Sequence, residues 1–343
     1  MLDTQTLFIF VFISVLLFDF TNGFHDTADM VATSIAAHTI RPSVAIFVVA
    51  LFTFLGPIIA GVAVADTVGT FVDIKTVDKA VAQSVVIGAL FAAISYNIST
   101  WYFGLPSSTS NSLAGGLVGA GLMGIGSSHI NWGIEALLNG KLDGLMKVIS
   151  GLFISPIFAF ITGFIVLKLF LYLFKRLTIK VEPIFIFSQY FGIAWLGFTH
   201  GANDAQKGMA IIGMMLLAIG KTQVFEIPMW VILSCTSAIT LGTIFGGWSI
   251  IKTLGFKIYK IRLLDSVANM FSAALVNSIA TIIGAPTSTT QVVTSSLLGN
   301  GAARNPRRTQ WNVANKIIKA WIFNIPISMA LGSLYTYLLL KVL

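Results

Sequence analysis

Two aspartates in matching motifs are the side chains best suited to bind a cation. Asp26 ends the motif FTNGFHD at 20–26, and Asp204 ends the related motif FTHGAND at 198–204. Both lie about 20 residues into long apolar segments. Placing a carboxylate at the centre of a bilayer costs about 2.5–3.5 kcal/mol of insertion free energy. Oxygen ligands suit small hard cations, although Asx side chains also cap broken helices. Further candidate cation ligands are Asn22, Asn203 and Asp19.

Two strings of small hydroxyl residues have the pattern of an anion site. GLPSSTS at 104–110 returns as GAPTSTT at 284–290. Proline suits the first turn of a helix, where free backbone N–H groups lie at the positive end of the helix dipole. Two such helix starts would hold a tetrahedral oxyanion from both sides, whereas one copy alone would only indicate close helix packing. The candidate anion ligands are Ser107, Ser108, Thr109, Ser110, Thr287, Ser288, Thr289 and Thr290.

Other polar residues near these motifs are accessory candidates. Asp29 and Lys207 each follow a motif aspartate by three residues, so they are expected to form a buried ion pair, or else Lys207 contacts the anion. His25 and His200 either orient ligands or pack in the interior. Asp19 is a further cation ligand if it lies at membrane depth, and otherwise lies near the outer interface.

The composition sets these motifs in a membrane. Of 343 residues, 56% are hydrophobic and only 10% are charged, against about 25% charged in soluble domains. Apolar runs long enough to cross a hydrocarbon core recur, and lipid requires them to be helical. The net charge is +8, and the basic residues lie in short loops between apolar segments. Such residues set the orientation of a membrane protein, so they do not indicate nucleic-acid binding. Ten helical stretches are predicted, at 5–36, 42–66, 78–103, 107–126, 145–175, 183–217, 226–252, 263–283, 287–303 and 311–341.

The chain repeats itself. The motif aspartates are 178 residues apart (204 − 26), and the hairpin strings are 180 apart (284 − 104). We therefore expect an all-α integral membrane protein with one transmembrane domain, 1–343, made of repeat 1 (about 1–177) and repeat 2 (about 178–343). Each repeat has an odd number of crossings, so the second should be inverted, and the two Gly-x-Pro hairpins should meet near the bilayer midplane.

Loop charges predict the orientation of this arrangement. One side collects 14 Lys and Arg, at 41, 168–180, 252–262 and 304–319. The other side collects 6, at 75–147, 221 and 341, and Lys207 lies inside a motif. Because the basic side of a membrane protein is cytoplasmic, both termini are expected on the outer face.

The paired motifs resemble those of the inorganic phosphate transporter (PiT) family. Its signature is a duplicated Gly-x-Asn-Asp or Gly-Phe-His-Asp motif with a downstream Ser/Thr hairpin, and both elements occur in both halves of this chain. The resemblance implies symport of inorganic phosphate with sodium or protons, with Asp26 and Asp204 as the signature aspartates. It implies phosphate, sodium and the bilayer of the cell (inner) membrane as partners, no organic cofactor and no nucleic acid. The resemblance also allows a homodimer.

The sequence departs from the family pattern at three positions. Asn111 and Gln291 stand where many members have histidine, and Asp29 stands where many have asparagine. Losing a pair of titratable histidines favours sodium over protons, with sodium at Asp26 and Asp204. The aspartates could also carry protons, so proton- or metal-coupled transport remains the alternative.

Three other functions compete with phosphate symport. A sulfate permease of the same family would use the same oxyanion cradle. An ion channel also uses inward hairpins, but it usually builds its pore around a subunit axis, whereas both copies here lie in one chain. An intramembrane enzyme would use the pair His25 and Asp26, but no set of nucleophile, base and orienting residue occurs in both halves.

The orientation is testable by cysteine labelling in a chain whose native Cys235 has been replaced. A cysteine at Arg307 should not react with a membrane-impermeant thiol reagent on intact cells, because the basic loop 304–310 is predicted to be cytoplasmic. A cysteine in the loop 127–144 should react. The reverse labelling pattern would overturn the predicted orientation.

Overall fold

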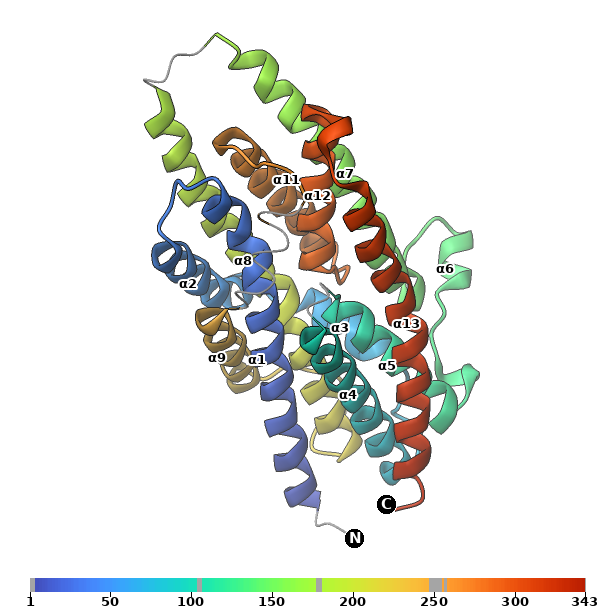
Figure 1. The fold of residues 1–343 in the computed structure, drawn as a ribbon. Coiled ribbons are helices and arrows are strands. Elements are labelled where there is room, and N and C mark those ends of the chain that lie inside the picture. The colour runs from blue at the N-terminus through green and yellow to red at the C-terminus, as the bar shows by residue number, and fades with distance from the viewer. Residues whose placement is uncertain (1–3, 104–106, 177–180, 247–254, 256–257, 343) are drawn as a thin grey trace.

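The computed structural model describes residues 4–103, 107–176, 181–246, 255 and 258–342, and this part of the chain is helical. Figure 1 shows long helices running between two ends, with both termini at the lower end. The α-helices are α1 (Thr4–Ala36), α2 (Pro42–Ala60), α3 (Ala63–Thr70), α4 (Lys79–Tyr102), α5 (Thr109–Gly124), α6 (Ile134–Leu138), α7 (Gly144–Leu173), α8 (Glu182–Ala218), α9 (Met229–Phe245), α11 (Leu263–Ile282), α12 (Thr289–Arg304) and α13 (Trp311–Leu339).

Six of the described helices are long and apolar enough to cross a membrane: α1, α2, α4, α7, α11 and α13. The predicted stretches agree with the helices except at their ends and at one break. The stretch 42–66 is divided at Gly61, whose φ of 80° ends α2, and α3 then runs to Thr70. Gln206 of α8 fixes this break, because its amide oxygen accepts the N–H groups of Val64 and Ala65 at 2.8 and 2.9 Å. The predicted helical residues 247–252 lie outside the described part.

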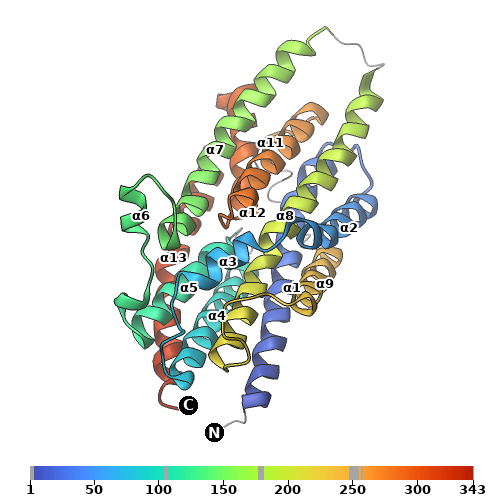
Figure 2. The ribbon, with the colours of Figure 1, turned by 180° about the vertical axis from the view of Figure 1, so that it is seen from behind.

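The short helices α5 and α12 are half-helices that start in the middle of the molecule. The pair α4 and α5 reaches the middle from the lower end, and α11 and α12 reach it from the upper end (Figures 1 and 2). Their starting residues touch, since the Ser110 hydroxyl donates to the Thr287 carbonyl at 2.6 Å. The junction 104–106 of the first predicted hairpin lies outside the described residues.

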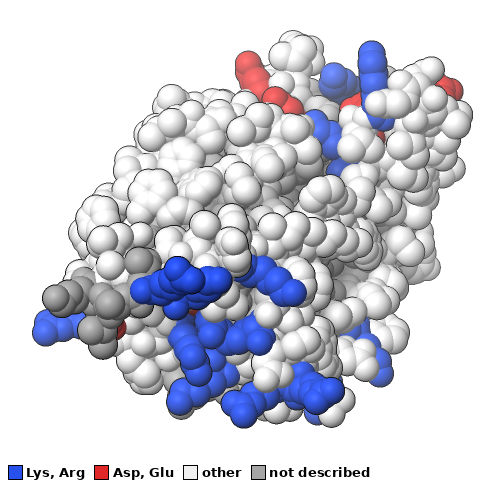
Figure 3. Space-filling view, turned by 90° about the horizontal axis from the view of Figure 1, so that it is seen from above, with Lys and Arg blue, Asp and Glu red and all other residues white. Residues whose placement is uncertain are grey.

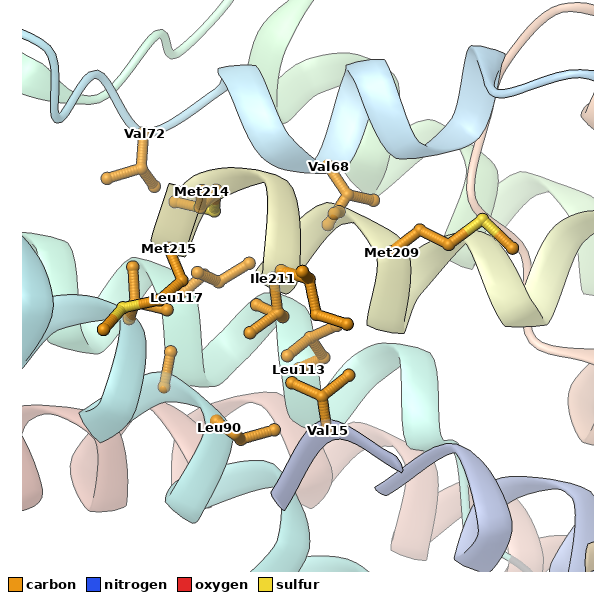
Figure 4. Close-up of a cluster of buried hydrophobic side chains, with 14 of the residues drawn as sticks. Val15, Val68, Val72, Leu90, Leu113, Leu117, Met209, Ile211, Met214 and Met215 are labelled. Atoms are coloured by element: carbon orange, nitrogen blue, oxygen red, sulfur yellow. The ribbon is translucent and has the colours of Figure 1, made fainter. Parts of the chain in front are cut away.

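The helices pack in matching pairs. Helix α1 packs against α9 and α8 against α2, while α5 packs against α13 and α12 against α7. In the sequence repeat, the pair of α1 with α9 corresponds to the pair of α8 with α2. The pair of α5 with α13 corresponds in the same way to the pair of α12 with α7. Buried apolar side chains between α1, α3, α4, α5 and α8 form the larger core, part of which is drawn in Figure 4.

Glycines make the crossings of α1 with α9 and of α8 with α2 possible. A Cβ on Gly23 would lie 2.0 Å from the Ile239 carbonyl oxygen, and one on Gly242 would lie 1.9 Å from that of Phe20. On the other pair, a Cβ on Gly201 would lie 2.1 Å from the Thr53 carbonyl oxygen. The motif glycines at 23 and 201 therefore let two backbones touch, as small residues do between membrane helices.

The upper end of the molecule is basic. Figure 3 looks onto this end and shows Lys and Arg gathered over one side of it. A hollow of about 980 Å³ opens beside α11 and α13, and its lining includes Lys260, Arg262 and Arg308. The end of α7, the start of α8 and the loop that joins α12 to α13 lie at the same end (Figure 1).

Replacing Gly242 with alanine should destabilise the protein, because the added methyl group meets the backbone of α1. Overpacking of this kind costs about 1–3 kcal/mol. Gly121→Ala is the matched control, since its Cβ would lie 3.3 Å from the Val72 side chain. Thermal unfolding in detergent should show a lower midpoint for Gly242→Ala than for Gly121→Ala, and equal midpoints would contradict the close crossing.

Candidate functional site

The two motif aspartates meet in the interior. Asp26 of α1 and Asp204 of α8 are 2% and 0% exposed. His200 lies between them, with its Nδ1 3.2 Å from Asp204 Oδ2 and 4.0 Å from Asp26 Oδ2. One ligand atom from each of these three residues lies within 4.8 Å of the others, which is close enough to share an ion. His25 lies beside Asp26, with its Nδ1 3.7 Å from Asp26 Oδ1.

Lys207 pairs with Asp204 and not with Asp29, so the ion pair expected between Asp29 and Lys207 is wrong. Its ammonium donates to Asp204 Oδ1, to the Ser110 hydroxyl and, at 2.8 Å, to the Thr287 carbonyl oxygen. The i, i+3 spacing on α8 places Lys207 beside Asp204 on the same helix face. Lys207 therefore joins α8 to the starts of both half-helices.

Asp29 makes its contact with the opposite hairpin. The Thr290 hydroxyl lies 2.6 Å from Asp29 Oδ2 and 2.8 Å from Asp26 Oδ1. The second oxygen of Asp29 is buried without a hydrogen-bond partner in the described structure. Two carboxylates of α1 thus share a single hydroxyl of α12.

The hairpin hydroxyls lie against the aspartate motifs. The Thr109 hydroxyl donates to Asn22 Oδ1 at 2.8 Å, and the Thr289 hydroxyl donates to Asp204 Oδ2 at 2.7 Å. All eight candidate anion ligands are buried. Hydrogen bonds therefore connect three predicted cation ligands, Asn22, Asp26 and Asp204, to the hairpins.

Ser108 and Ser288 cap the half-helices. The Ser108 hydroxyl accepts the Asn111 N–H at 3.1 Å, and the Ser288 hydroxyl accepts the Gln291 N–H at 3.3 Å. An N-cap satisfies one of the free N–H groups of a helix start and leaves the others available. The side-chain oxygens of Asn111 and Gln291 are buried without a partner in the described structure.

The two asparagines of the aspartate motifs have different roles. Asn203 holds the second hairpin, because its amide donates to the Ala285 carbonyl at 3.2 Å and accepts the Thr287 N–H at 2.9 Å. Asn22 accepts from Thr109, and its NH₂ group has no partner in the described part. Their contribution to cation binding stays a prediction.

Asp19 directly precedes the motif on α1, seven residues (26 − 19) before Asp26. It is fully buried, and neither carboxylate oxygen has a hydrogen-bond partner among the described residues. A Cβ on Gly208 would lie 2.2 Å from Asp19 Oδ2, so the carboxylate rests on the bare backbone of α8 next to Lys207. The membrane depth of Asp19 and its role as a cation ligand stay predictions.

The side chains of the polar site are buried in the described structure, and a pocket of about 350 Å³ reaches His25 beside them. A small cavity of about 10 Å³, enough for about one water molecule, adjoins Ser110 and Lys207. It is otherwise lined by apolar residues of α3, α5 and α7 and by Pro286. The basic hollow at the upper end does not include any of the hairpin residues in its lining.

Sequence analysis missed two asparagines that support the hairpins. Asn97 of α4 accepts the Ser112 hydroxyl at 2.9 Å, and Asn277 of α11 accepts the Thr287 hydroxyl at 3.2 Å. These asparagines are 180 residues apart (277 − 97), the same offset as the hairpin strings. The repeat offset was therefore the signal that could have found them.

The chain is similar to known phosphate transporters. The profile of the phosphate transporter family matches residues 22–332. A "probable low-affinity inorganic phosphate transporter" of Bacillus subtilis (strain 168) is 38% identical over 96% of this chain and 96% of its own. A protein with the same description from Rhizobium meliloti (strain 1021) is 37% identical over 93% of this chain and 92% of its own.

A solved structure has the same fold. The protein titled "The sodium-dependent phosphate transporter" superimposes with a TM-score of 0.84, at 22% identity, over 98% of this chain and 100% of its own. The matched relatives are described as transporters and not as enzymes. On the family profile and the two bacterial relatives, this chain belongs to the phosphate transporter family.

Proposed function

We propose that this phosphate transporter is a sodium-coupled symporter that works by alternating access around the buried polar site. The observation that carries the proposal is that two half-helix starts and two motif aspartates meet at one place in the interior. Membership of the phosphate transporter family supports phosphate as the substrate. The printed title of the structural neighbour, a sodium-dependent phosphate transporter, supports sodium as the coupling ion.

Phosphate is proposed to bind between the starts of α5 and α12. The first N–H groups of each helix are free of intrahelical partners, and the helix dipoles favour an anion there. The Lys207 ammonium at the same junction adds a full positive charge. Hydroxyls such as Ser110 and Thr290 would exchange their present internal partners for phosphate oxygens.

The cation is proposed to bind on the aspartate side of the same junction. Asp26 and Asp204 supply carboxylate oxygens, and Thr289 and Thr290 link these carboxylates to α12. A cation that neutralises the carboxylates would lower their repulsion toward phosphate, so each substrate favours binding of the other. This mutual dependence is what symport requires.

Alternating access is proposed to arise from two inverted repeats, about 1–177 and 178–343. The two hairpins approach the junction from opposite ends (Figure 1), so opening either hairpin would expose the site to one side of the membrane. The excess of Lys and Arg at the upper end supports a cytoplasmic position for that end of the chain in the cell membrane.

Phosphate uptake into proteoliposomes should require sodium and should be lost in Asp26→Asn and in Asp204→Asn. Each change removes a carboxylate charge at the site while it keeps the side-chain size. Glu135→Gln, in the exposed helix α6, is the matched control and should transport normally. Full uptake after sodium is replaced by choline would rule out sodium coupling, and normal uptake in either asparagine variant would remove that aspartate from the mechanism.

Ser288→Ala should have two effects, because the hydroxyl caps α12 at the proposed phosphate site. Loss of a hydrogen bond to a charged ligand should weaken phosphate binding roughly 10- to 150-fold. Loss of the cap should lower stability by about 1 kcal/mol. Equilibrium phosphate binding at saturating sodium and thermal unfolding measure the two effects, with the exposed Ser99→Ala as control. Near-native affinity in Ser288→Ala would place phosphate away from this hairpin.

A further inference from the structure

The two halves of the site carry opposite charges at one equivalent position. Asp29 and Lys207 are 178 residues apart (207 − 29), the same offset as the motif aspartates Asp26 and Asp204. Likewise, Ser110 and Thr290 are 180 apart (290 − 110), the offset of the hairpins. One pocket thus combines Asp204 and Lys207 of the second half with Ser110 of the first half. The other pocket combines Asp26 and Asp29 of the first half with Thr290 of the second half.

In the second half, the Lys207 ammonium is surrounded by oxygen. Its contacts are a carboxylate oxygen of Asp204, the Ser110 hydroxyl and the Thr287 carbonyl. These three ligand types are also those that hard cations take from proteins. An ammonium group has three N–H donors, and each of them has a partner here. Lys207 therefore occupies this pocket as a cation that cannot dissociate.

The equivalent pocket, built around Asp26 and Asp29, holds two carboxyl groups and, among the described residues, no ammonium. The Thr290 hydroxyl contacts Asp26 Oδ1 at 2.8 Å and Asp29 Oδ2 at 2.6 Å. A hydroxyl has one hydrogen, so it can donate to only one of the two carboxylates. The other oxygen of Asp29 is buried and has no partner in the described structure. The nearest basic atoms to Asp26 are His25 Nδ1 at 3.7 Å and His200 Nδ1 at 4.0 Å.

We propose that the two pockets are functionally unequal. The pocket of Asp26, Asp29 and Thr290 binds an exchangeable sodium ion, whereas the ammonium of Lys207 permanently fills the equivalent pocket at Asp204. The inference rests on the proposed sodium symport and refines it, because it assigns the exchangeable cation to Asp26 and Asp29 rather than to Asp26 and Asp204. Asp204 then serves to hold Lys207, and Asp26 and Asp29 serve to couple transport.

Lys207→Met tests the inference, because it removes the ammonium and keeps a side chain of similar length. The freed pocket at Asp204 should accept sodium, so the ratio of sodium to phosphate taken up by proteoliposomes should rise by one. Lys221→Met, which removes an exposed lysine, is the matched control and should leave the ratio unchanged. An unchanged ratio in folded Lys207→Met would overturn the inference.

A binding measurement keeps the test independent of transport. A ligand that binds only the folded protein raises its thermal midpoint, so replacing choline with sodium should raise the midpoint more in Lys207→Met than in the wild type. Equal shifts would contradict a newly opened pocket.

Asp29→Lys places a fixed cation in the first half and tests the other pocket. It should lower the sodium-to-phosphate ratio by one, and an unchanged ratio would overturn the assignment of sodium to Asp26 and Asp29. Asp29→Asn should instead keep the ratio and weaken the apparent sodium affinity roughly tenfold or more. If sodium does not stimulate wild-type uptake at all, the proposed symport fails and the sodium pocket with it. If sodium stimulates wild-type uptake but Lys207→Met and Asp29→Lys both keep the wild-type sodium-to-phosphate ratio, the unequal pockets are rejected and the proposed symport stands.

Discussion

Charge buried at the junction of two half-helices is the constraint on which this structure depends. Asp26, Asp29, Asp204 and Lys207 are each 2% exposed or less, in a protein whose helices are otherwise apolar on the outside. Isolated charges at such depth are costly, so each must have compensating groups. The compensation comes from one ammonium, from hydroxyls of both hairpins and from the positive ends of α5 and α12.

The rest of the fold brings these compensating groups together. A helix that spans the membrane has its starting N–H groups at the surface, so only a half-helix can present them in the middle. The serine caps and the supporting asparagines Asn97 and Asn277 stabilise those interior helix starts. Glycines at the helix crossings then allow α1 and α8, which carry the aspartates, to approach closely packed neighbours.

Much of this arrangement could be predicted from the sequence because it is written twice. Apolar runs predicted the helical stretches, and two motifs at nearly equal offsets predicted the paired half-helices. Which hairpin Asp26 contacts came only from the structure. The partner of Lys207 could not be predicted in the same way. The sequence suggested Asp29 of α1 or the anion as its partner, whereas the structure pairs it with Asp204, one helix turn away on α8.

The roles of individual side chains within the hairpins could not be predicted from the sequence either. Serine in the first turn suits both a cap and a ligand, and the difference lies in a side-chain rotation that leaves no trace in residue type. The asparagines at 22 and 203 illustrate the same limit, since one faces a threonine and the other holds a hairpin backbone. Residue identity restricts what such a group can do, while its neighbours select one of the options.

The start of each hairpin is hydrogen-bonded to a different helix, and this bears on which contacts a rocking motion would break. Asn203 ties the second hairpin to α8, whereas Asn324 of α13 donates to the Ser108 carbonyl at 2.7 Å and ties the start of α5 to a different helix. Ser110, Thr287 and Lys207 join the two hairpin starts directly, and α1 also contacts both hairpins through Asn22 and Asp26. A rocking motion would break a few of these polar contacts and would leave each hairpin attached to its own support.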